Sequence, residues 1–233
     1  MNYNANDNLE IMKFAKNYNC FLINLVVNEI IKLNAKYIAD FGCADGFFIK
    51  EISKKINTKC SFVGIEKDKT SISICKEKNI NITTELNNIN KQDIIYSFNV
   101  LEHIEDDVKI LQEFYSKLHN NGKLILFLPA FNFLFTSMDK KTGHFRRYNK
   151  KEIGKKLNDC GFKIERIEYF DILGAILTLI YKLLDNFIQQ NGNITKKQIL
   201  FFDKLFKINY FITKFFFKKL FGKNLVIIAR KYL

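Results

Sequence analysis

Short apolar stretches alternate with amphipathic segments along most of this chain. Apolar residues recurring every three or four positions predict helices at 9–33, 46–56, 68–78, 104–119 and 149–160. The apolar stretches between them predict strands at 37–42, 60–66, 80–83, 93–98, 121–129, 162–170 and 224–232. Because the strands are apolar throughout and alternate with helices, we expect an α/β fold, with a buried, mostly parallel sheet covered by helices on both faces.

The pattern predicts a single domain over residues 1–233, with no linker and no internal repeat. A helical cap at 1–35 precedes a core at 36–171. A helical insertion at 172–222 then separates the core from the last strand, which lies within 223–233.

The stretch "DFGCADGFF" at 40–48 forms a tight turn between the first predicted strand and its helix. Gly42 and Gly46 allow close backbone approach to a ligand, and ligands of open α/β sheets bind beyond the carboxyl ends of strands. Glu66 follows Gly46 by 20 residues and ends the second strand, where an acid can accept hydrogen bonds from ribose hydroxyls. The dinucleotide and triphosphate glycine motifs are absent. Asp40 would repel a pyrophosphate and suits a ligand with amino and sulfonium charges.

Three segments resemble the class I S-adenosylmethionine-dependent methyltransferases: "DFGCADGFF", "FVGIEKD" and "DIIYSFNVLEHIEDD". The last is similar to the small-molecule branch that includes ubiquinone-biosynthesis enzymes. The resemblance covers 36–171 and the last strand, and Ala44 departs from it by replacing a glycine. It implies a Rossmann-like sheet of seven strands with the last one antiparallel, and S-adenosylmethionine as cofactor.

The resemblance also implies the residues that hold this cofactor. Asp40, Gly42 and Gly46 would line its methionine end, Cys43 would contribute backbone, and Glu66 would hold the ribose. Alternatives remain for three of them: Gly42 and Gly46 could serve packing, and Glu66 could cap the next helix. Glu85 and Leu86 would lie at the adenine, and Asn99, Val100 and Leu101 would border the methionine and the methyl group.

The segment "LPAFNFLFTSMDKKTGHFRRYNKKEI" resembles a bacterial methyltransferase subgroup associated with the assembly of cell-surface glycans and lipid-linked sugars. Arg146 and Arg147 are two of only four arginines in a lysine-rich chain, which favours recognition of a phosphate or carboxylate by a planar guanidinium. The alternative is a structural ion pair to Glu102, Asp139 or Glu152. His144 is the first candidate for a general base, with His103 second. We therefore place His144 in catalysis, and Arg146, Arg147, Tyr148 and His103 at the acceptor.

The formal charge of +13 permits anionic partners, although its lysines are spread along the chain. Nucleic acid remains an alternative substrate, but the sequence lacks a [DN]-P-P-[YF] signature, a Pro-Cys nucleophile and a separable stacking platform. A non-catalytic cofactor-binding protein is a further alternative. We expect a small-molecule or lipid-linked acceptor, and the sequence does not specify an oligomeric state.

The five cysteines have no metal-ligand or redox spacing, so we expect thiols in a reducing compartment and no metal site. The amino terminus shows no signal pattern and no apolar run is long enough to span a membrane, which favours a cytoplasmic location. The insertion is rich in phenylalanine and lysine. It is interpreted foremost as a cap over the site, and otherwise as a peripheral membrane contact or a dimer interface.

Overall fold

The computed structural model describes residues 10–57, 59–184 and 195–232. Its sheet of seven strands has the order β3-β2-β1-β4-β5-β7-β6. Strands β1 to β5 run parallel, whereas β7 lies antiparallel between β5 and β6. The expected doubly wound sheet with an antiparallel last strand is therefore confirmed. The strands are β1 (Tyr37–Phe41), β2 (Ser61–Ile65), β3 (Ile82–Thr83), β4 (Gln92–Phe98), β5 (Leu118–Pro129), β6 (Phe162–Phe170) and β7 (Asn224–Lys231).

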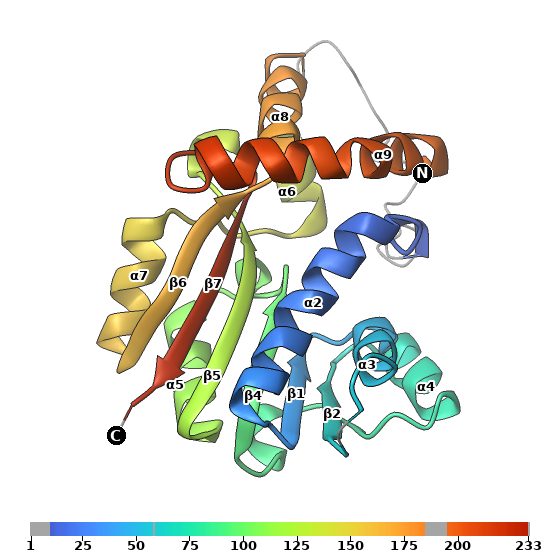
Figure 1. Ribbon diagram of the computed structural model, residues 1–233, viewed down its shortest axis with the longest axis vertical. Helices are drawn as coiled ribbons and strands as arrows, with labels where there is room; N and C mark the ends of the chain where they lie inside the picture. Colours follow the sequence, from blue (N-terminus) through green and yellow to red (C-terminus); the bar gives the residue numbers. More distant parts are fainter. Residues whose placement is uncertain (1–9, 58, 185–194, 233) are drawn as a thin grey trace.

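Helices cover both faces of this sheet (Figure 1). The helices of the core are α2 (Lys16–Leu33), α3 (Phe47–Ser53), α4 (Lys69–Glu77), α5 (Asp107–Lys117), α6 (Ser137–Thr142) and α7 (Lys150–Asp159). Short helices η1 (Leu86–Asn88), η2 (Leu101–His103) and η3 (Asn132–Leu134) lie in the connections. The predicted helix at 9–33 is interrupted by a turn at 13–14, and its main part begins at Lys16.

Alternating strand residues feed two separate hydrophobic layers, because successive side chains point to opposite faces of a sheet. In β4, Ile94 and Tyr96 pack with α2 and α3, whereas Ile95 faces the layer formed with α5 and α7. In β5, Ile125 belongs to the first layer and Leu124 to the second. Burial on both faces explains why the strands are apolar throughout.

The insertion consists of α8 (Ile172–Leu184), α9 (Lys196–Ile212) and the π-helical turn η4 (Thr213–Phe217). Helix α9 crosses one end of the molecule, near the start of α2, and α8 projects from that end (Figure 1). Phe187, part of the expected phenylalanine-rich segment, lies outside the described residues. No described helix is both long enough and apolar enough to cross a membrane.

Candidate functional site

The glycine turn lies at the carboxyl end of β1, as predicted. Gly42, Ala44 and Gly46 all have positive φ, at 77°, 46° and 76°. The Gly42 amide donates to the Ile65 carbonyl at the end of β2 over 2.8 Å, and the Gly46 amide donates to the Cys43 carbonyl over 2.9 Å. Only glycine adopts this backbone region without steric cost, so Ala44 is held in a strained conformation.

Close packing around the turn leaves no room for a side chain at Gly42 or Gly46, and this requires glycine independently of the backbone conformation. A Cβ on Gly42 would come within 2.3 Å of the Val100 side chain, and one on Gly46 would come within 2.1 Å of Ile80. The Gly42 position therefore brings the segment after β4 against the segment after β1. This contact joins the Val100 region to the predicted cofactor turn.

Asp40 is 3% exposed at the end of β1. Burial raises the pKa of Asp40 to about 8; the nearby Tyr96 hydroxyl opposes this rise and the Glu66 carboxylate adds to it. Its Oδ2 has no hydrogen-bond partner among the described residues. A buried carboxyl group with an unpartnered oxygen is suited to a ligand that brings a hydrogen-bond donor or a positive charge.

Glu66 closes the turn from the end of β2. Its Oε2 accepts a hydrogen bond from the Ala44 amide over 2.9 Å, and its Oε1 accepts bonds from the amides of Lys67 and Asp68. Helix α4 is capped by Asp68, which accepts from the Ser71 amide over 2.8 Å. Glu66 is thus not the side chain that caps this helix, and it reaches the glycine turn directly.

The structure brings some of the other predicted cofactor residues to this end of the sheet. The Cys43 amide donates to the Ile65 carbonyl over 3.2 Å, and the Asn99 amide donates to the Phe127 carbonyl over 2.8 Å. Leu101 is buried in the core beyond β4. After β3, Glu85 is exposed and precedes η1, whereas Leu86 points into the core. Cofactor contacts by these residues stay predictions.

A cavity of about 250 Å³ lies elsewhere, between β6 and the insertion. Tyr169, Phe170, Tyr210 and Lys214 are among its lining residues. None of the predicted cofactor residues lines it. We place the site at the glycine turn nonetheless, because a buried unpartnered acid and a strained backbone are closer indicators of ligand chemistry than cavity size.

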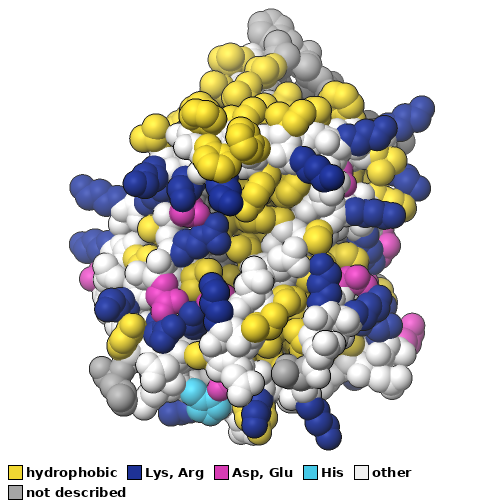
Figure 2. All heavy atoms as spheres, in the orientation of Figure 1, with side chains coloured by type: hydrophobic (Ala, Val, Ile, Leu, Met, Phe, Trp, Pro, Cys, Tyr) yellow, Lys and Arg dark blue, Asp and Glu magenta, His cyan; other side chains and the backbone are white. Residues whose placement is uncertain are grey.

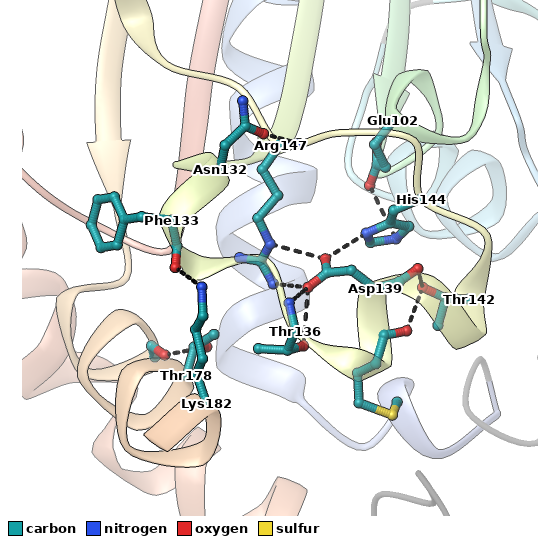
Figure 3. Close-up of polar contacts among 12 residues, drawn as sticks. Glu102, Asn132, Phe133, Thr136, Asp139, Thr142, His144, Arg147, Thr178 and Lys182 are labelled. Carbon is teal, nitrogen blue, oxygen red and sulfur yellow. Dashed lines mark hydrogen bonds and ion pairs between the residues drawn. The ribbon is translucent and has the colours of Figure 1, made fainter. Parts of the chain in front are cut away.

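His144, Asp139 and Arg147 form a second cluster, in the segment after β5. Figure 3 shows His144 and Arg147 approaching the Asp139 carboxylate from two sides. His144 Nδ1 lies 2.7 Å from Asp139 Oδ1, and the Arg147 guanidinium donates from Nε and Nη2 to the two carboxylate oxygens, each over 2.9 Å. The pKa of Asp139 falls well below its usual range, because these partners outweigh the effect of burial. An ionised Asp139 holds the proton of His144 on Nδ1 and leaves Nε2 as an acceptor.

A short capped helix followed by a tight turn reverses the chain and brings the residues of this cluster together. Thr136 is the N-cap residue of α6 and shares a capping box with Asp139, which therefore points back to the start of the helix. Gly143 ends the helix with a φ of 81°, and the His144 amide donates to the Asp139 carbonyl over 2.8 Å. Gly143 thus turns the chain, and His144 is presented from the loop that follows α6.

Glu102 faces the other side of His144 from η2. Its Oε1 lies 4.0 Å from His144 Nε2, the residue is fully buried, and neither carboxyl oxygen has a hydrogen-bond partner among the described residues. Burial raises the pKa of Glu102 to about 8, and the nearby backbone amide and the Arg147 charge oppose this rise. The two carboxyl groups beside His144 therefore differ in protonation at neutral pH.

His103 stands against His144, with ring centroids 4.5 Å apart. Desolvation, followed by the neighbouring His144, lowers the pKa of His103. Glu102, His103 and His144 each present a potential metal-ligand atom, and these atoms lie within 4.8 Å of one another. Cysteine spacing predicted no metal site and did not indicate this group, which forms only through folding.

The remaining residues of "GHFRRY" are engaged within the protein. Arg146 Nη1 lies 2.9 Å from Asp107 Oδ2, and its Nη2 donates to the Glu105 carbonyl over 2.7 Å. Tyr148 is fully buried and its hydroxyl donates to Asp107 Oδ2 over 2.9 Å. Arg147 is 5% exposed, and its Nη1 has no partner among the described residues. Acceptor binding by these three residues stays a prediction, and the alternative ion pair to Asp139 is present for Arg147.

Asp139 and Glu102 were not predicted as partners of His144. From the sequence, both were expected only as ion-pair partners for the arginines. Asp139 could have been found from the capping pattern, since a threonine three residues before an acid and a glycine four residues after it predict a short capped helix. Glu102 carries no such signal, because its burial depends on the packing of η2.

The family described as "Methyltransferase domain" matches residues 32–160, which is more than half of the chain. A search of curated proteins found no match. The fold is shared with solved structures of low sequence identity.

A putative sarcosine dimethylglycine methyltransferase from Galdieria sulphuraria has a TM-score of 0.61 at 13% identity, covering 91% of this chain and 86% of that one. A SAM-dependent methyltransferase from Archaeoglobus fulgidus has a TM-score of 0.55 at 17% identity, covering 90% and 94%. The plantazolicin methyltransferase BamL, solved with S-adenosylhomocysteine (SAH) and a triazolic desmethylPZN analog, has a TM-score of 0.58 at 15% identity, covering 92% and 85%. The chain therefore belongs to the methyltransferase domain family and is an S-adenosylmethionine-dependent methyltransferase.

Proposed function

We propose that this enzyme methylates an oxygen, or a nitrogen, of a small anionic acceptor such as a sugar, a sugar phosphate or a lipid-linked glycan precursor. The observation that carries the proposal is the pairing of His144 Nδ1 with the ionised Asp139 over 2.7 Å. This pairing leaves Nε2 of a half-buried imidazole able to take a proton. A neutral hydroxyl must lose a proton when it is methylated, so the geometry supports an oxygen acceptor with His144 as general base.

Arg147 has two tasks in this proposal. Its Nε and Nη2 fix the orientation of Asp139 and hence of His144. Its Nη1 is buried without a partner among the described residues, and buried donors are rarely left unpaired. We assign this nitrogen to an anionic group of the acceptor. Arg146, whose charge is already paired with Asp107, would support the rim of the same site.

The cofactor residues fit S-adenosylmethionine. Asp40, with its unpartnered Oδ2, would receive the amino group, the backbone of the glycine turn would lie along the methionine end, and Glu66 would hold the ribose. When bound, the cofactor supplies a methyl group carried on a sulfonium. The chain itself orients the acceptor, excludes water and accepts the proton on His144 Nε2.

The test is an acceptor screen with isotope-labelled methyl donor, followed by histidine variants. The screen includes free hexoses, hexose phosphates, nucleotide sugars, polyprenyl-linked sugars and RNA. With a hydroxyl acceptor, His144→Ala should lower kcat by about 10²–10⁴-fold and leave the affinity for SAH unchanged. His119→Ala is the matched control, since His119 pairs with Asp93 at the amino-terminal ends of β5 and β4, opposite the glycine turn.

Two results would contradict the assignment of His144 as base. One is an unchanged kcat in the His144→Ala protein. The other is loss of methyl transfer after treatment with a chelator and its recovery with a divalent cation, because Glu102, His103 and His144 would then act as metal ligands. Methylation of RNA alone would overturn the proposed acceptor class.

A further inference from the structure

The inner face of helix α9 carries polar as well as apolar residues, whereas an ordinary surface helix buries an apolar stripe. Ile199 is buried there, and Phe206 and Tyr210 pack on the aromatic cluster formed with α2. Three polar residues of α9 and η4 are buried: Asp203, Asn209 and Thr213. Asp203 accepts hydrogen bonds from the amides of Asn17 and Tyr18 over 3.1 and 3.0 Å, at the start of α2. Specific polar contacts therefore contribute to holding this helix on the body of the protein.

The outward face of the insertion is aromatic and aliphatic. Phe211, Phe215 and Phe216 are 57%, 61% and 65% exposed, and Leu220 is 70% exposed. Along α8, Ile176, Leu177, Leu179, Ile180 and Leu183 are exposed as well. Figure 2 shows these hydrophobic side chains gathered over the end of the molecule where α8 and α9 lie. A contiguous exposed apolar face of this kind indicates an interaction surface.

The positive charge around this apolar face favours an anionic partner. The insertion contains eight lysines and two aspartates in sequence. In its described part the one acidic residue is Asp203, which is buried. Lys204, Lys207, Lys214 and Lys219 are exposed beside the aromatic residues. A second copy of this chain would bring the same positive charges together, which opposes a symmetric dimer, whereas an anionic lipid surface neutralises them.

We propose that the face formed by α8, α9 and residues 213–220 binds the surface of a membrane rich in anionic phospholipid. Its phenylalanines enter the boundary between headgroups and acyl chains, and its lysines contact the phosphates. The inner contacts of α9 support this orientation. The hydrogen bonds of Asp203 and the packing of Phe206 hold the helix on the protein, and the outer phenylalanines stay exposed for lipid. The inference is independent of the acceptor and of the role of His144.

Sedimentation with vesicles tests the proposal on the full chain. The protein should pellet with phosphatidylglycerol vesicles at low salt and be released at high salt, and it should bind phosphatidylcholine vesicles much more weakly. The triple variant Lys204→Glu, Lys207→Glu, Lys214→Glu should lower the partition coefficient by about 100-fold or more. Its matched control is Lys36→Glu, Lys59→Glu, Lys91→Glu, which changes the charge equally at the amino ends of β1, β2 and β4 and should bind nearly as the wild type.

A second pair of variants tests the apolar contact. Phe211→Ser with Phe215→Ser should weaken vesicle binding, whereas Ile31→Ser with Tyr37→Ser, at exposed apolar sites away from the insertion, should not. Thermal unfolding confirms that each variant is folded. The proposal is overturned if the wild type stays in the supernatant with anionic vesicles at low salt, or if the control triple loses as much binding. It is equally overturned if the protein does not bind vesicles and instead forms a dimer that is lost when Phe211 and Phe215 are replaced by serine.

Discussion

His144 stands between two carboxyl groups whose environments give them different protonation states. Asp139 is kept ionised by His144 and Arg147, whereas burial keeps Glu102 protonated up to a pKa of about 8. Such a separation lets one carboxylate orient an imidazole while the other adds no negative charge. Because Glu102 changes its protonation state on folding, the free energy of unfolding should depend on pH, and this dependence can be measured.

We predict that Glu102→Gln removes part of the loss of stability between pH 5 and pH 8. Between the ordinary pKa of 4.5 and the folded value of about 8, the native state binds a proton that the unfolded state does not. Stability therefore falls as pH rises through this window. The free energy of unfolding in urea should decline more in the wild type than in the variant, by about 4 kcal/mol. Glu77→Gln, at an exposed position on α4, should follow the wild type; parallel curves for Glu102→Gln and the wild type would show that Glu102 ionises normally.

Glu66 supports a second prediction at this scale, about the cofactor. Its carboxylate holds the Ala44 amide and lies where ribose hydroxyls are expected. Glu66→Ala should weaken the binding of SAH by about 1–3 kcal/mol, because hydroxyl donors are left unpaired. Calorimetric titration measures this change, and Glu77→Ala at an exposed position on α4 provides a comparison. An unchanged dissociation constant for Glu66→Ala would move the ribose contact to another residue.

The two parts of the site differ in how far the sequence predicts them. Gly42, Gly46 and Glu66 were predicted together because the carboxyl ends of parallel strands meet at one edge of a sheet. The pairing of His144 with Asp139 was not predicted, since it requires a six-residue helix to end at Gly143 and return the chain on itself. The burial of Glu102 depends on tertiary packing alone.

At the scale of elements, strand positions were predicted within a few residues because the strands are apolar throughout and bounded by turns. Helix ends were predicted less well, because the position of a helix end depends on which polar side chain caps it, and the apolar pattern does not show this. The helix expected from residue 104 begins at Asp107, where Asp106 caps it by accepting from the Lys109 amide. Helix α2 begins at Lys16, and the acceptor for its first amides comes from Asp203 on α9, 186 residues away from Asn17. A cap supplied from so distant a segment leaves no local pattern.

The contact between α2 and α9 can be tested through Asp203. Asp203→Ala removes the acceptor of the Asn17 and Tyr18 amides, and we expect it to lower the free energy of unfolding by about 1–2 kcal/mol, as the loss of a helix cap does. Asp203→Asn should cost less, because its amide oxygen can still accept. Lys204→Ala, the exposed neighbour, is the control. Equal melting temperatures for Asp203→Ala and the control would mean that α9 is held by its apolar contacts alone.

At the scale of the whole molecule, the insertion is joined to the segment that carries His144. Lys182 of α8 donates to the Phe133 carbonyl over 2.5 Å, and the Tyr181 hydroxyl lies 3.5 Å from Ser137 Oγ. Helix α8 of the proposed membrane face is therefore in direct contact with the segment proposed to bind the acceptor (Figures 1 and 3). In an enzyme resting on a membrane through α8 and α9, these two contacts would tie the segment that carries His144 to the membrane-bound helices.

Hydrogen exchange can separate the two surfaces in one experiment. SAH should slow amide exchange in the turn at 42–46 and in the residues after β2, because its binding orders the backbone of that edge. Phosphatidylglycerol vesicles should instead slow exchange in α8 and α9 and leave the turn unchanged. With both present, the two sets of protected amides should add. Protection by SAH that is confined to α9 and β6, around the 250 Å³ cavity, would place the cofactor there and contradict the assignment of Asp40, Gly42 and Glu66.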